Sequence, residues 1–326
     1  MLYINNISTN PYFNVAAEEY ILENFEDDCF MLWMIEPTLL IGRNQNTLSE
    51  INIDYVKAKN IYVVRRLTGG GTIYEDLGNL NFTFIVKNQL SDFTNFKKFA
   101  QPIIDVLKKL SVDAEFSGRN DLTIKGQKFS GNAQCKYNNK ILHHGSLLFS
   151  SNLENVCASL NVDPSKFQDK SVKSVSSRVT NISDHLEKPL DISEFSKMIS
   201  AHILETNKDI KPYTFTNYDI EQITKLAESK YSTWDWNFGE SPKYNLKKRK
   251  KYTFGLVEFN LDVKNGVIKN AKFFGDFFGK YDISHIENAL IGVKHTPEDI
   301  TKALSSYNIN DYFTNISIDD LMEGMF

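Results

Sequence analysis

The chain has 326 residues, of which 41% are hydrophobic and 24% charged, a balance typical of a soluble globular protein. Its net charge of −4 argues against a nucleic-acid-binding protein, which usually carries a basic excess. The three cysteines form no CxxC pair, so neither a zinc knuckle nor a redox pair is indicated, and a reducing cytosol is favoured. The first residues do not resemble a signal peptide, and no apolar run reaches the ~18 residues of a spanning helix, so we expect a cytoplasmic protein.

The hydrophobic pattern predicts helices and strands through the first 150 residues. Asn14 is expected to cap a helix over residues 15–25. A second helix over 96–110 follows from apolar residues at helical spacing, with Pro102 as a possible kink. Apolar or alternating runs predict strands at residues 30–35, 61–64, 80–86 and 141–149, and two short strands within 121–134 that join at Lys125-Gly126.

A second domain is predicted towards the C-terminus. The composition changes after Tyr231, and residues 234–251 have weak periodicity and end in a basic run. Beyond this run, Asn265-Gly266 is a strong signal for a two-residue hairpin. Helical patterns follow near residues 282–291 and 297–305. We therefore expect a large domain over 1–243 and a small α+β domain over 244–326, both within the usual size range of domains.

The segment RRLTGGGTIYEDLGNLNFTF, residues 65–84, has the composition of an anion cradle. Three consecutive glycines, residues 69–71, let the backbone approach a ligand and expose neighbouring N–H groups. Arg66 adds a side chain that can make a two-pronged contact with a phosphate or a carboxylate. The spacing fits neither a Walker A loop nor a Rossmann fingerprint. The alternative is a glycine hairpin with solvated arginines.

A second segment, GRNDLTIKGQKFSGNAQ over residues 118–134, places a lysine among small residues. Lys128 is a point charge suited to a phosphate and a carboxylate that react together. Asp121 would suit a divalent cation, since hard cations prefer oxygen ligands. Taken alone, a lysine such as Lys128 is more often a surface residue, and Asp121 more often a turn residue after Asn120.

A third segment, LHHGSLLF over residues 142–149, contains two adjacent histidines. Neighbouring residues on a strand point to opposite faces, so His143 and His144 are not expected to bind one metal ion together. We expect one of the two histidines to face a ligand pocket instead.

These three segments, with NPYFNVAAEEYIL at residues 10–22 and IGRNQN at 41–46, resemble the lipoate–protein ligase family of the two-domain lipoate–protein ligase A type. The resemblance covers nearly the whole chain, and five motifs in order are highly specific. It implies an α+β fold: a large catalytic domain similar to biotin protein ligases and class II aminoacyl-tRNA synthetases, with a mixed, mostly antiparallel sheet. The small α+β C-terminal domain would be the accessory domain of the two-domain ligases.

The resemblance also implies roles for particular residues. Lys128 would be the catalytic residue that contacts both the acyl carboxylate and the α-phosphate, and Asp121 would hold Mg²⁺. The residues implied to bind ATP or the adenylate are Arg66, Gly71, Thr72, Ile73, Tyr74, Asn79 and Lys128. Those implied to bind lipoate are Arg66, Gly70, Lys128 and His144. Some members carry an arginine just after the SGxA segment, where this chain has Gln134-Cys135-Lys136, so a contact from that arginine is in doubt here.

The implied activity is ATP-dependent ligation of lipoate through lipoyl-AMP to a lysine of an acceptor protein. The implied partners are apo lipoyl domains of 2-oxo-acid dehydrogenase complexes and the glycine cleavage H protein, and the enzyme is expected to be a monomer that acts on neither nucleic acid nor membrane.

Three alternatives differ in their chemistry. A lipoyl or octanoyl transferase of the same superfamily would pass the acyl group through a cysteine, yet residues 112–127 contain none. A biotin protein ligase would carry GRGRxG, which the chain lacks. A non-catalytic lipoyl-adenylate-binding protein would not need Arg66, Lys128 and Asp121 together.

Overall fold

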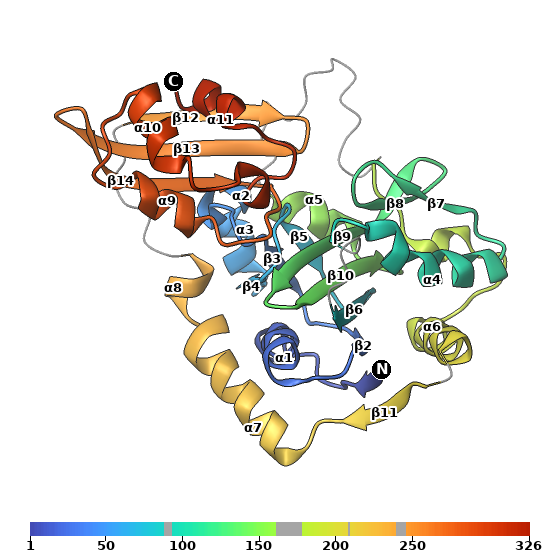
Figure 1. The fold of residues 1–326 in the computed structure, drawn as a ribbon. Helices are drawn as coiled ribbons and strands as arrows, with labels where there is room; N and C mark the ends of the chain where they lie inside the picture. The colour runs from blue at the N-terminus through green and yellow to red at the C-terminus, as the bar shows by residue number, and fades with distance from the viewer. Residues whose placement is uncertain (88–92, 161–177, 208, 239–245) are drawn as a thin grey trace. The chain divides into compact units, whose positions relative to one another are not determined.

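The computed structural model describes residues 1–87, 93–160, 178–207, 209–238 and 246–326 (Figure 1). The chain folds into two compact units. The large unit consists of residues 1–41, 47–66 and 72–237, and the small unit of residues 42–46, 67–71 and 238–326. Two short segments from the first quarter of the sequence therefore belong to the small unit.

An eight-stranded sheet forms the framework of the large unit. Its strands, in spatial order, are β11 (Lys211–Thr214), β1 (Leu2–Asn5), β2 (Cys29–Trp33), β6 (Asn79–Lys87), β10 (Lys140–Leu148), β9 (Gln127–Tyr137), β8 (Asp121–Ile124) and β7 (Ala114–Ser117). β1 runs parallel to both of its neighbours, and every other pair in this sheet is antiparallel. A second sheet has the order β4 (Tyr62–Arg65), β3 (Thr38–Ile41) and β5 (Ile73–Glu75). The predicted mixed, mostly antiparallel sheet is confirmed.

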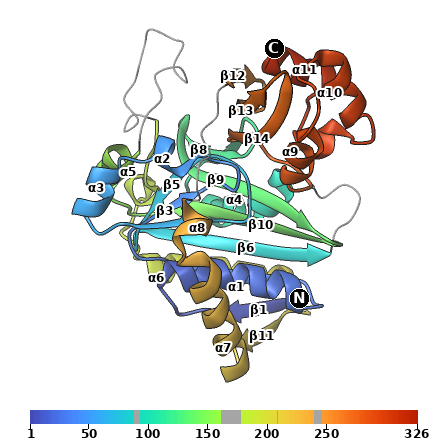
Figure 2. The same cartoon turned by 90° about the vertical axis from the view of Figure 1, so that its left-hand side faces the viewer.

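Helices lie on both faces of the large sheet, with α1 (Pro11–Asn24) on one face and α4 (Phe96–Lys109) on the other. The described part of the large unit also contains α2 (Thr47–Glu50), α3 (Ile53–Ala58), α5 (Leu153–Ser159), η3 (Ile182–His185), α6 (Ile192–Thr206), α7 (Asn217–Leu226), η4 (Ala227–Tyr231) and α8 (Trp234–Asn237). Side chains alternate along β10, so His143 meets Phe99 of α4 whereas His144 meets Glu18 of α1. The main core lies between the sheet and α4 with α6, and Figure 2 shows α1 running beside β6.

The first helix begins earlier than the sequence pattern predicts. α1 starts at Pro11, and the Asn10 side chain accepts a hydrogen bond from the Phe13 N–H at 3.1 Å. Proline favours the first helical position because its fixed φ suits the helix and its missing N–H would have no helical partner there. The expected cap, Asn14, is instead buried inside the helix, where its amide donates to the carbonyls of Ser8 and Met34 at 2.8 and 2.9 Å.

The small unit has its own sheet and its own core. β12 (Leu246–Tyr252), β13 (Gly255–Lys264) and β14 (Val267–Gly275) form an antiparallel sheet. Packed with it are α9 (Ser284–Leu290), α10 (Pro297–Leu304), η5 (Ile309–Asp311) and α11 (Ile318–Met325). Asn265 and Gly266 have φ of 51° and 72°, as a type I′ hairpin turn requires. The basic run at the end of residues 234–251, which shows weak periodicity in the sequence, forms strand β12.

The two early segments are tied into this small unit by backbone contacts. The Gly275 N–H donates to the Asn44 carbonyl at 2.7 Å. A Cβ on Gly69 would lie 2.3 Å from the Phe277 carbonyl oxygen, so only glycine fits at that position. Arg43 forms an ion pair with Asp282 at 2.6 Å.

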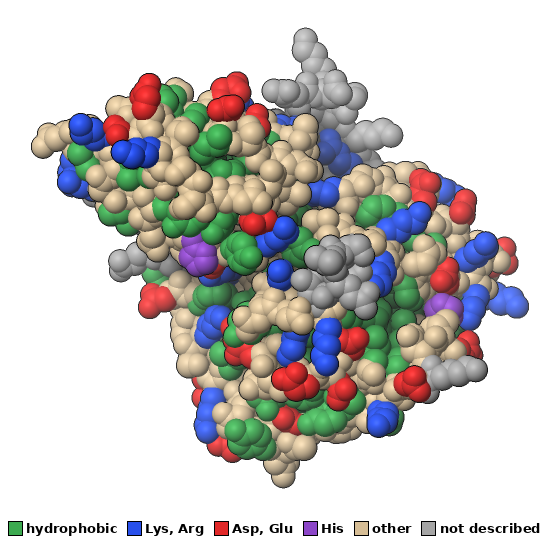
Figure 3. Space-filling model, in the orientation of Figure 1, with side chains coloured by type: hydrophobic (Ala, Val, Ile, Leu, Met, Phe, Trp, Pro, Cys, Tyr) green, Lys and Arg blue, Asp and Glu red, His purple; other side chains and the backbone are tan. Residues whose placement is uncertain are grey.

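Two surface properties agree with the composition. Within the described ranges, no helix is both long and apolar enough to cross a bilayer. Acidic and basic side chains are intermingled over the face seen in Figure 3, as expected for a protein whose net charge is only −4.

Candidate active site

The β8–β9 hairpin positions Lys128. Its turn, Lys125-Gly126, has φ of 50° and 76°, which is the two-residue geometry predicted from sequence. A β-bulge lies between the pairs Leu122↔Ser130 and Thr123↔Lys128. On the other side of β9, the Lys128 N–H donates to the Arg178 carbonyl at 2.8 Å, and the Lys128 carbonyl accepts from the Thr180 N–H at 3.0 Å. The lysine backbone is therefore held from both sides.

The Lys128 side chain reaches the carboxylate of Asp121. The Nζ–Oδ1 distance is 2.8 Å, and the two side chains are 38% and 37% exposed. A Cβ on Gly131 would lie 3.1 Å from Lys128 Nζ, so this glycine leaves room for the lysine side chain itself. An ion pair this open to water is weakly held, and the ammonium group remains available to an incoming anion.

Lys128 opens into a cavity of about 160 Å³. Thr72, Ile73 and Tyr74, from β5 and the residue before it, line this cavity together with Lys128–Gly131 of β9. The remaining lining comes from Ser146 and Leu148 of β10, Val156 and Leu160 at α5, and Val179. The structure thus brings together four of the residues predicted to bind the nucleotide, although they are separated in the sequence.

Arg66 lies in a buried charge cluster that the sequence pattern did not reveal. Its Nη1 donates to the Leu40 carbonyl at 2.9 Å. Burial lowers the pKa of Arg66 to about 10, and the carboxylates of Glu75 and Glu18 oppose this shift. Burial raises the pKa of Glu75 to about 7, although Asn81 donates to its Oε2 at 2.6 Å. Arg66 therefore keeps its positive charge at neutral pH.

His144 is oriented by α1. Its Nδ1 lies 3.0 and 3.1 Å from the two carboxylate oxygens of Glu18. Thr83 donates to the same carboxylate at 2.6 Å and accepts from the Trp33 indole at 2.9 Å. His143 points to the opposite face of β10, as strand alternation predicts. Within the part of the chain that the structure describes, no three metal-ligating side chains cluster.

The remaining predicted residues lie apart from the cavity lining or in the small unit. Asn79 is buried at the start of β6, and its Oδ1 accepts from the Asp76 N–H at 3.1 Å. Its Nδ2 has no hydrogen-bond partner among the described residues. Gly70, with φ of 92°, and Gly71 belong to the small unit.

The segment 233–237 is anchored at Arg65, next to Arg66, through Trp236 and Asn237. The Trp236 indole donates to the Arg65 carbonyl at 2.8 Å, and Arg65 Nε donates to the Trp236 carbonyl at 3.0 Å. The Arg65 N–H donates to Asn237 Oδ1 at 2.8 Å. Trp234, in contrast, is 54% exposed.

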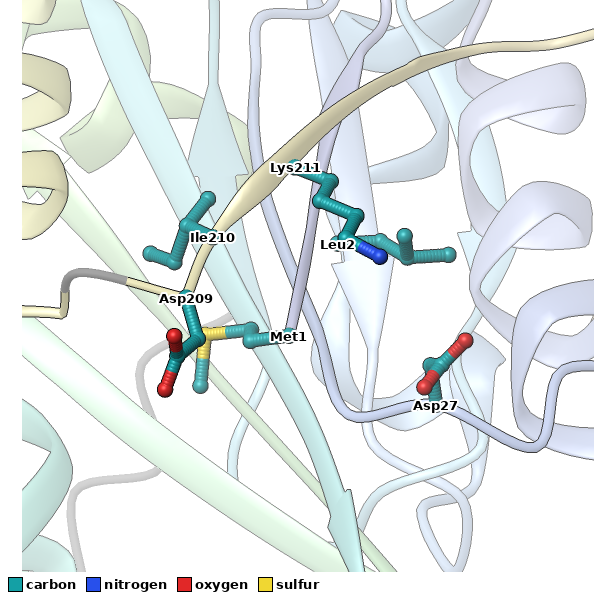
Figure 4. A pocket seen from close by; sticks show the side chains of 6 residues that line it. All are labelled: Met1, Leu2, Asp27, Asp209, Ile210 and Lys211. Carbon is teal, nitrogen blue, oxygen red and sulfur yellow. The ribbon is translucent and has the colours of Figure 1, made fainter.

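A larger cavity of about 380 Å³ lies beside β1 and β11 (Figure 4). It is lined by Met1, Leu2, Asp27, Asp209, Ile210 and Lys211. None of the residues predicted to bind lipoate or the nucleotide contributes to it. The smaller cavity at Lys128 is therefore the candidate active site.

The structure combines an α+β fold with a cavity in which a lysine faces a glycine-preceded loop, and comparison with known proteins identifies the family. Residues 10–204 match the family described as the lipoyl protein ligase A/B catalytic domain, and residues 241–325 match the bacterial lipoate protein ligase C-terminus. Lipoate–protein ligase 1 of Staphylococcus aureus is 44% identical, over 98% of each chain. The chain belongs to the lipoate–protein ligase family.

Solved structures resemble the chain as well. A P. falciparum protein crystallised with lipoate has a TM-score of 0.81 at 26% identity and covers 99% of this chain and 98% of its own. A lipoate–protein ligase A bound with ATP has a TM-score of 0.64 at 25% identity, over 73% of this chain and 98% of its own. A bipartite ligase from Thermoplasma acidophilum, described with its E2 lipoyl domain, has a TM-score of 0.66 at 29% identity, over 75% of this chain and 98% of its own.

Proposed function

We propose that this protein is an ATP-dependent lipoate–protein ligase. In the first half-reaction, a lipoate carboxylate oxygen attacks the α-phosphorus of ATP, giving lipoyl-AMP and pyrophosphate. In the second, the amine of an acceptor lysine attacks the acyl carbon, loses a proton, and forms an amide as AMP leaves. The observation that carries this proposal is the cavity shared by Lys128 and the residues 72–74 that follow the three glycines.

The charges of the site suit the first half-reaction. A carboxylate and a triphosphate bring several negative charges together, and the attack adds charge at the α-phosphate. Lys128 lies at the cavity wall, where its Nζ pairs at 2.8 Å with the partly exposed carboxylate of Asp121. Fixed positive groups lower the barrier most where charge develops in the transition state. We assign this role to Lys128, with Arg66 as the second cation and His144 beside the acyl chain.

Asp121 is the residue that would hold Mg²⁺. Magnesium in nucleotide sites is usually bound by one or two carboxylates together with phosphate oxygens and water. A single, partly exposed carboxylate next to the candidate phosphate-binding lysine satisfies that donor set. When bound, the ion would neutralise charge on the phosphates.

Lipoyl domains are the acceptors that we propose, both in 2-oxo-acid dehydrogenase complexes and in the glycine cleavage H protein. The structure of a related Thermoplasma ligase with its E2 lipoyl domain supports this assignment. We further propose that the enzyme works as a cytoplasmic monomer.

The deciding experiment measures pyrophosphate release and acceptor lipoylation with free lipoate, with and without ATP. The ligase should release pyrophosphate only when lipoate and ATP are both present, and should lipoylate the apo acceptor only then. Lipoylation from an acylated protein donor in the absence of ATP would instead identify a transferase.

The transferase alternative makes a separate prediction about cysteine. Cys29 is buried, and burial raises the pKa of its thiol, which suppresses the nucleophilic thiolate. Neither Cys135 nor Cys157 lines the Lys128 cavity. We expect a triple variant, Cys29→Ser with Cys135→Ser and Cys157→Ser, to ligate lipoate if it folds. A lipoyl thioester trapped on any of the three during turnover would contradict the ligase mechanism.

A further inference from the structure

His143 is a buried polar side chain to which the proposed mechanism gives no role. It lies on β10 with its ring stacked on Phe99 of α4, at a centroid separation of 4.6 Å and an interplanar angle of 22°. Phe82 and Phe96 pack around the same ring at 5.8 and 5.9 Å. A polar group in such an aromatic surrounding requires hydrogen-bond partners for its ring nitrogens.

The partners of His143 fix which nitrogen carries the proton. Gln134 Oε1 accepts from the Thr94 N–H at 2.7 Å, so the amide nitrogen of Gln134 faces His143 Nδ1 at 3.1 Å and must donate to it. Nδ1 is therefore an acceptor, and Nε2 carries the hydrogen. Nε2 donates to Asn132 Oδ1 at 3.2 Å. Burial lowers the pKa of His143 well below its usual 6.5, which agrees with a neutral ring.

The chain of hydrogen bonds ends at the residue that precedes Asp121. The Asn132 amide donates to the Asn120 carbonyl at 3.1 Å, and its backbone N–H donates to the same oxygen at 2.9 Å. Asn120 Nδ2 donates in return to the Asn132 carbonyl at 2.6 Å. We call the site of these three bonds the Asn120–Asn132 corner. Strand β8 begins at the next residue, Asp121, whose carboxylate pairs with Lys128. A Cβ on Gly145 would lie 2.5 Å from Asn132 Oδ1, so glycine is required beside this corner.

We propose that His143 is a positioning residue for lipoate activation, because its Nε2–H orients Asn132 and thereby directs the Asp121 carboxylate towards Lys128. The inference rests on the proposed ligase function. A neutral histidine suits the position because it offers one acceptor and one donor on opposite sides of a flat ring that also stacks on Phe99. Phenylalanine would preserve the stacking but remove the partners that His143 supplies to the Gln134 amide nitrogen and to Asn132 Oδ1, whereas glutamine offers both a donor and an acceptor.

The kinetic test compares His143→Phe with His143→Gln, and uses Ile103→Val as a control for loss of packing in the same core. Lipoyl-AMP formation and transfer from preformed lipoyl-AMP are measured in single turnovers, together with the melting temperature. The triphosphate is present only in the first half-reaction, so a displaced Asp121 should slow adenylation selectively. A misplacement of about 1 Å can slow a reaction by about a hundredfold.

We expect His143→Phe to slow adenylation about tenfold to a hundredfold and to leave transfer nearly unchanged. His143→Gln should recover part of the lost rate. The control should lower the melting temperature without separating the two half-reactions. If His143→Phe slows both half-reactions equally, or neither, His143 is only a packing residue and the inference fails.

The tautomer is tested without any variant. In ¹⁵N NMR spectra of the wild-type protein, His143 should show a protonated Nε2 and an unprotonated Nδ1 through the neutral pH range. A ring protonated at Nδ1 would overturn the inference even if the kinetics agreed. Failure of the wild-type protein to form lipoyl-AMP would refute the proposed function instead, and the NMR result would still decide the hydrogen-bond chain.

Discussion

Trp236 and Arg65 are joined by two reciprocal hydrogen bonds, each from a side-chain N–H of one residue to the backbone carbonyl of the other. The bonds measure 2.8 and 3.0 Å and link residues that are 171 positions apart in the sequence. Because Arg65 directly precedes Arg66, this contact fixes the backbone from which the candidate substrate-binding arginine extends.

The first prediction follows from this pairing. Trp236→Phe removes the indole N–H and leaves the Arg65 carbonyl without that donor, so the free energy of unfolding should fall by about 1 kcal/mol. If the pairing positions Arg66, lipoyl-AMP formation should also slow, by about tenfold. Trp234→Phe is the matched control, because Trp234 is mostly exposed and should change neither quantity. Equal behaviour of the two variants in urea unfolding and single-turnover adenylation would refute the prediction.

Removal of the Lys128 ammonium should abolish most adenylation while the fold persists. Lys128→Ala deletes a partly exposed side chain, and such changes usually alter stability by less than about 0.5 kcal/mol. The loss of a charge directed at the reacting phosphate should reduce the rate by about 10²–10³. Lys125→Ala, in the turn of the same hairpin, should behave as wild type. A lipoyl-AMP yield from Lys128→Ala close to that of wild type would remove this residue from the mechanism.

Glu75 should make stability depend on pH. The folded-state pKa of about 7 lies above the ordinary value of 4.5, so between these values the folded protein binds more protons than the unfolded chain. The contribution of Glu75 to the free energy of unfolding should therefore be greatest below pH 4.5 and should be lost as the pH rises through 7. The total change in this contribution is about 3 kcal/mol. Glutamine at this position cannot ionise.

We therefore expect Glu75→Gln to be more stable than wild type at pH 8, with the difference shrinking as the pH approaches 5. Urea unfolding at pH 5, 6, 7 and 8 measures this difference directly. Other groups, such as His143, titrate in both proteins and cancel from the comparison. A difference that does not change with pH would show that Glu75 does not titrate in this window.

The basic strand β12 should assist acceptor binding through two of its lysines. Lys248 donates to the Phe326 carbonyl and Lys250 pairs with Glu323, each at 2.6 Å, so both are engaged at the C-terminal helix α11. Lys247 and Lys251 are exposed and share the other face of the strand. An acidic acceptor surface would be attracted to them most strongly at low salt.

Reversal of these two charges, Lys247→Glu with Lys251→Glu, should slow transfer from preformed lipoyl-AMP several-fold at low salt, and less at high salt. Adenylation and melting temperature should not change, because exposed charges contribute little to folding. Lys269→Glu with Lys302→Glu, at exposed positions on β14 and α10, also reverses two charges and serves as a control for net charge. If both variants transfer at the same rate, β12 has no specific part in docking.

The sequence predicted local features of the fold well. Apolar runs located β4, β6 and β10, and the Lys125-Gly126 and Asn265-Gly266 turns located two hairpins, because each signal lies within a few neighbouring residues. The predicted cap of α1, Asn14, was wrong. Asn10 and Asn14 are both plausible caps by residue type, and only Pro11, which favours the first helical position, identifies Asn10. The domain limits proposed at 1–243 and 244–326 stay a prediction.

The candidate site was predicted in part. Lys128 and residues 72–74 lie within recognisable motifs, and the structure brings them to one cavity. The partners that orient the site are distant in sequence: Glu18 is 126 positions from His144. A carboxylate on a helix and a histidine on a strand carry no local sign of their pairing, so only the fold reveals it.

Because residues 42–46 and 67–71 belong to the small unit, a cut at one point in the sequence cannot separate the two units. A gene split after codon 237 would give a first polypeptide carrying two loops whose backbone partners, at Gly275 and Phe277, are encoded on the second. The second polypeptide would in turn lack the segments that pack on its own strands. We expect the two polypeptides to be recovered in native form only when they are co-expressed and reassemble, since the residues that form the small unit are divided between them.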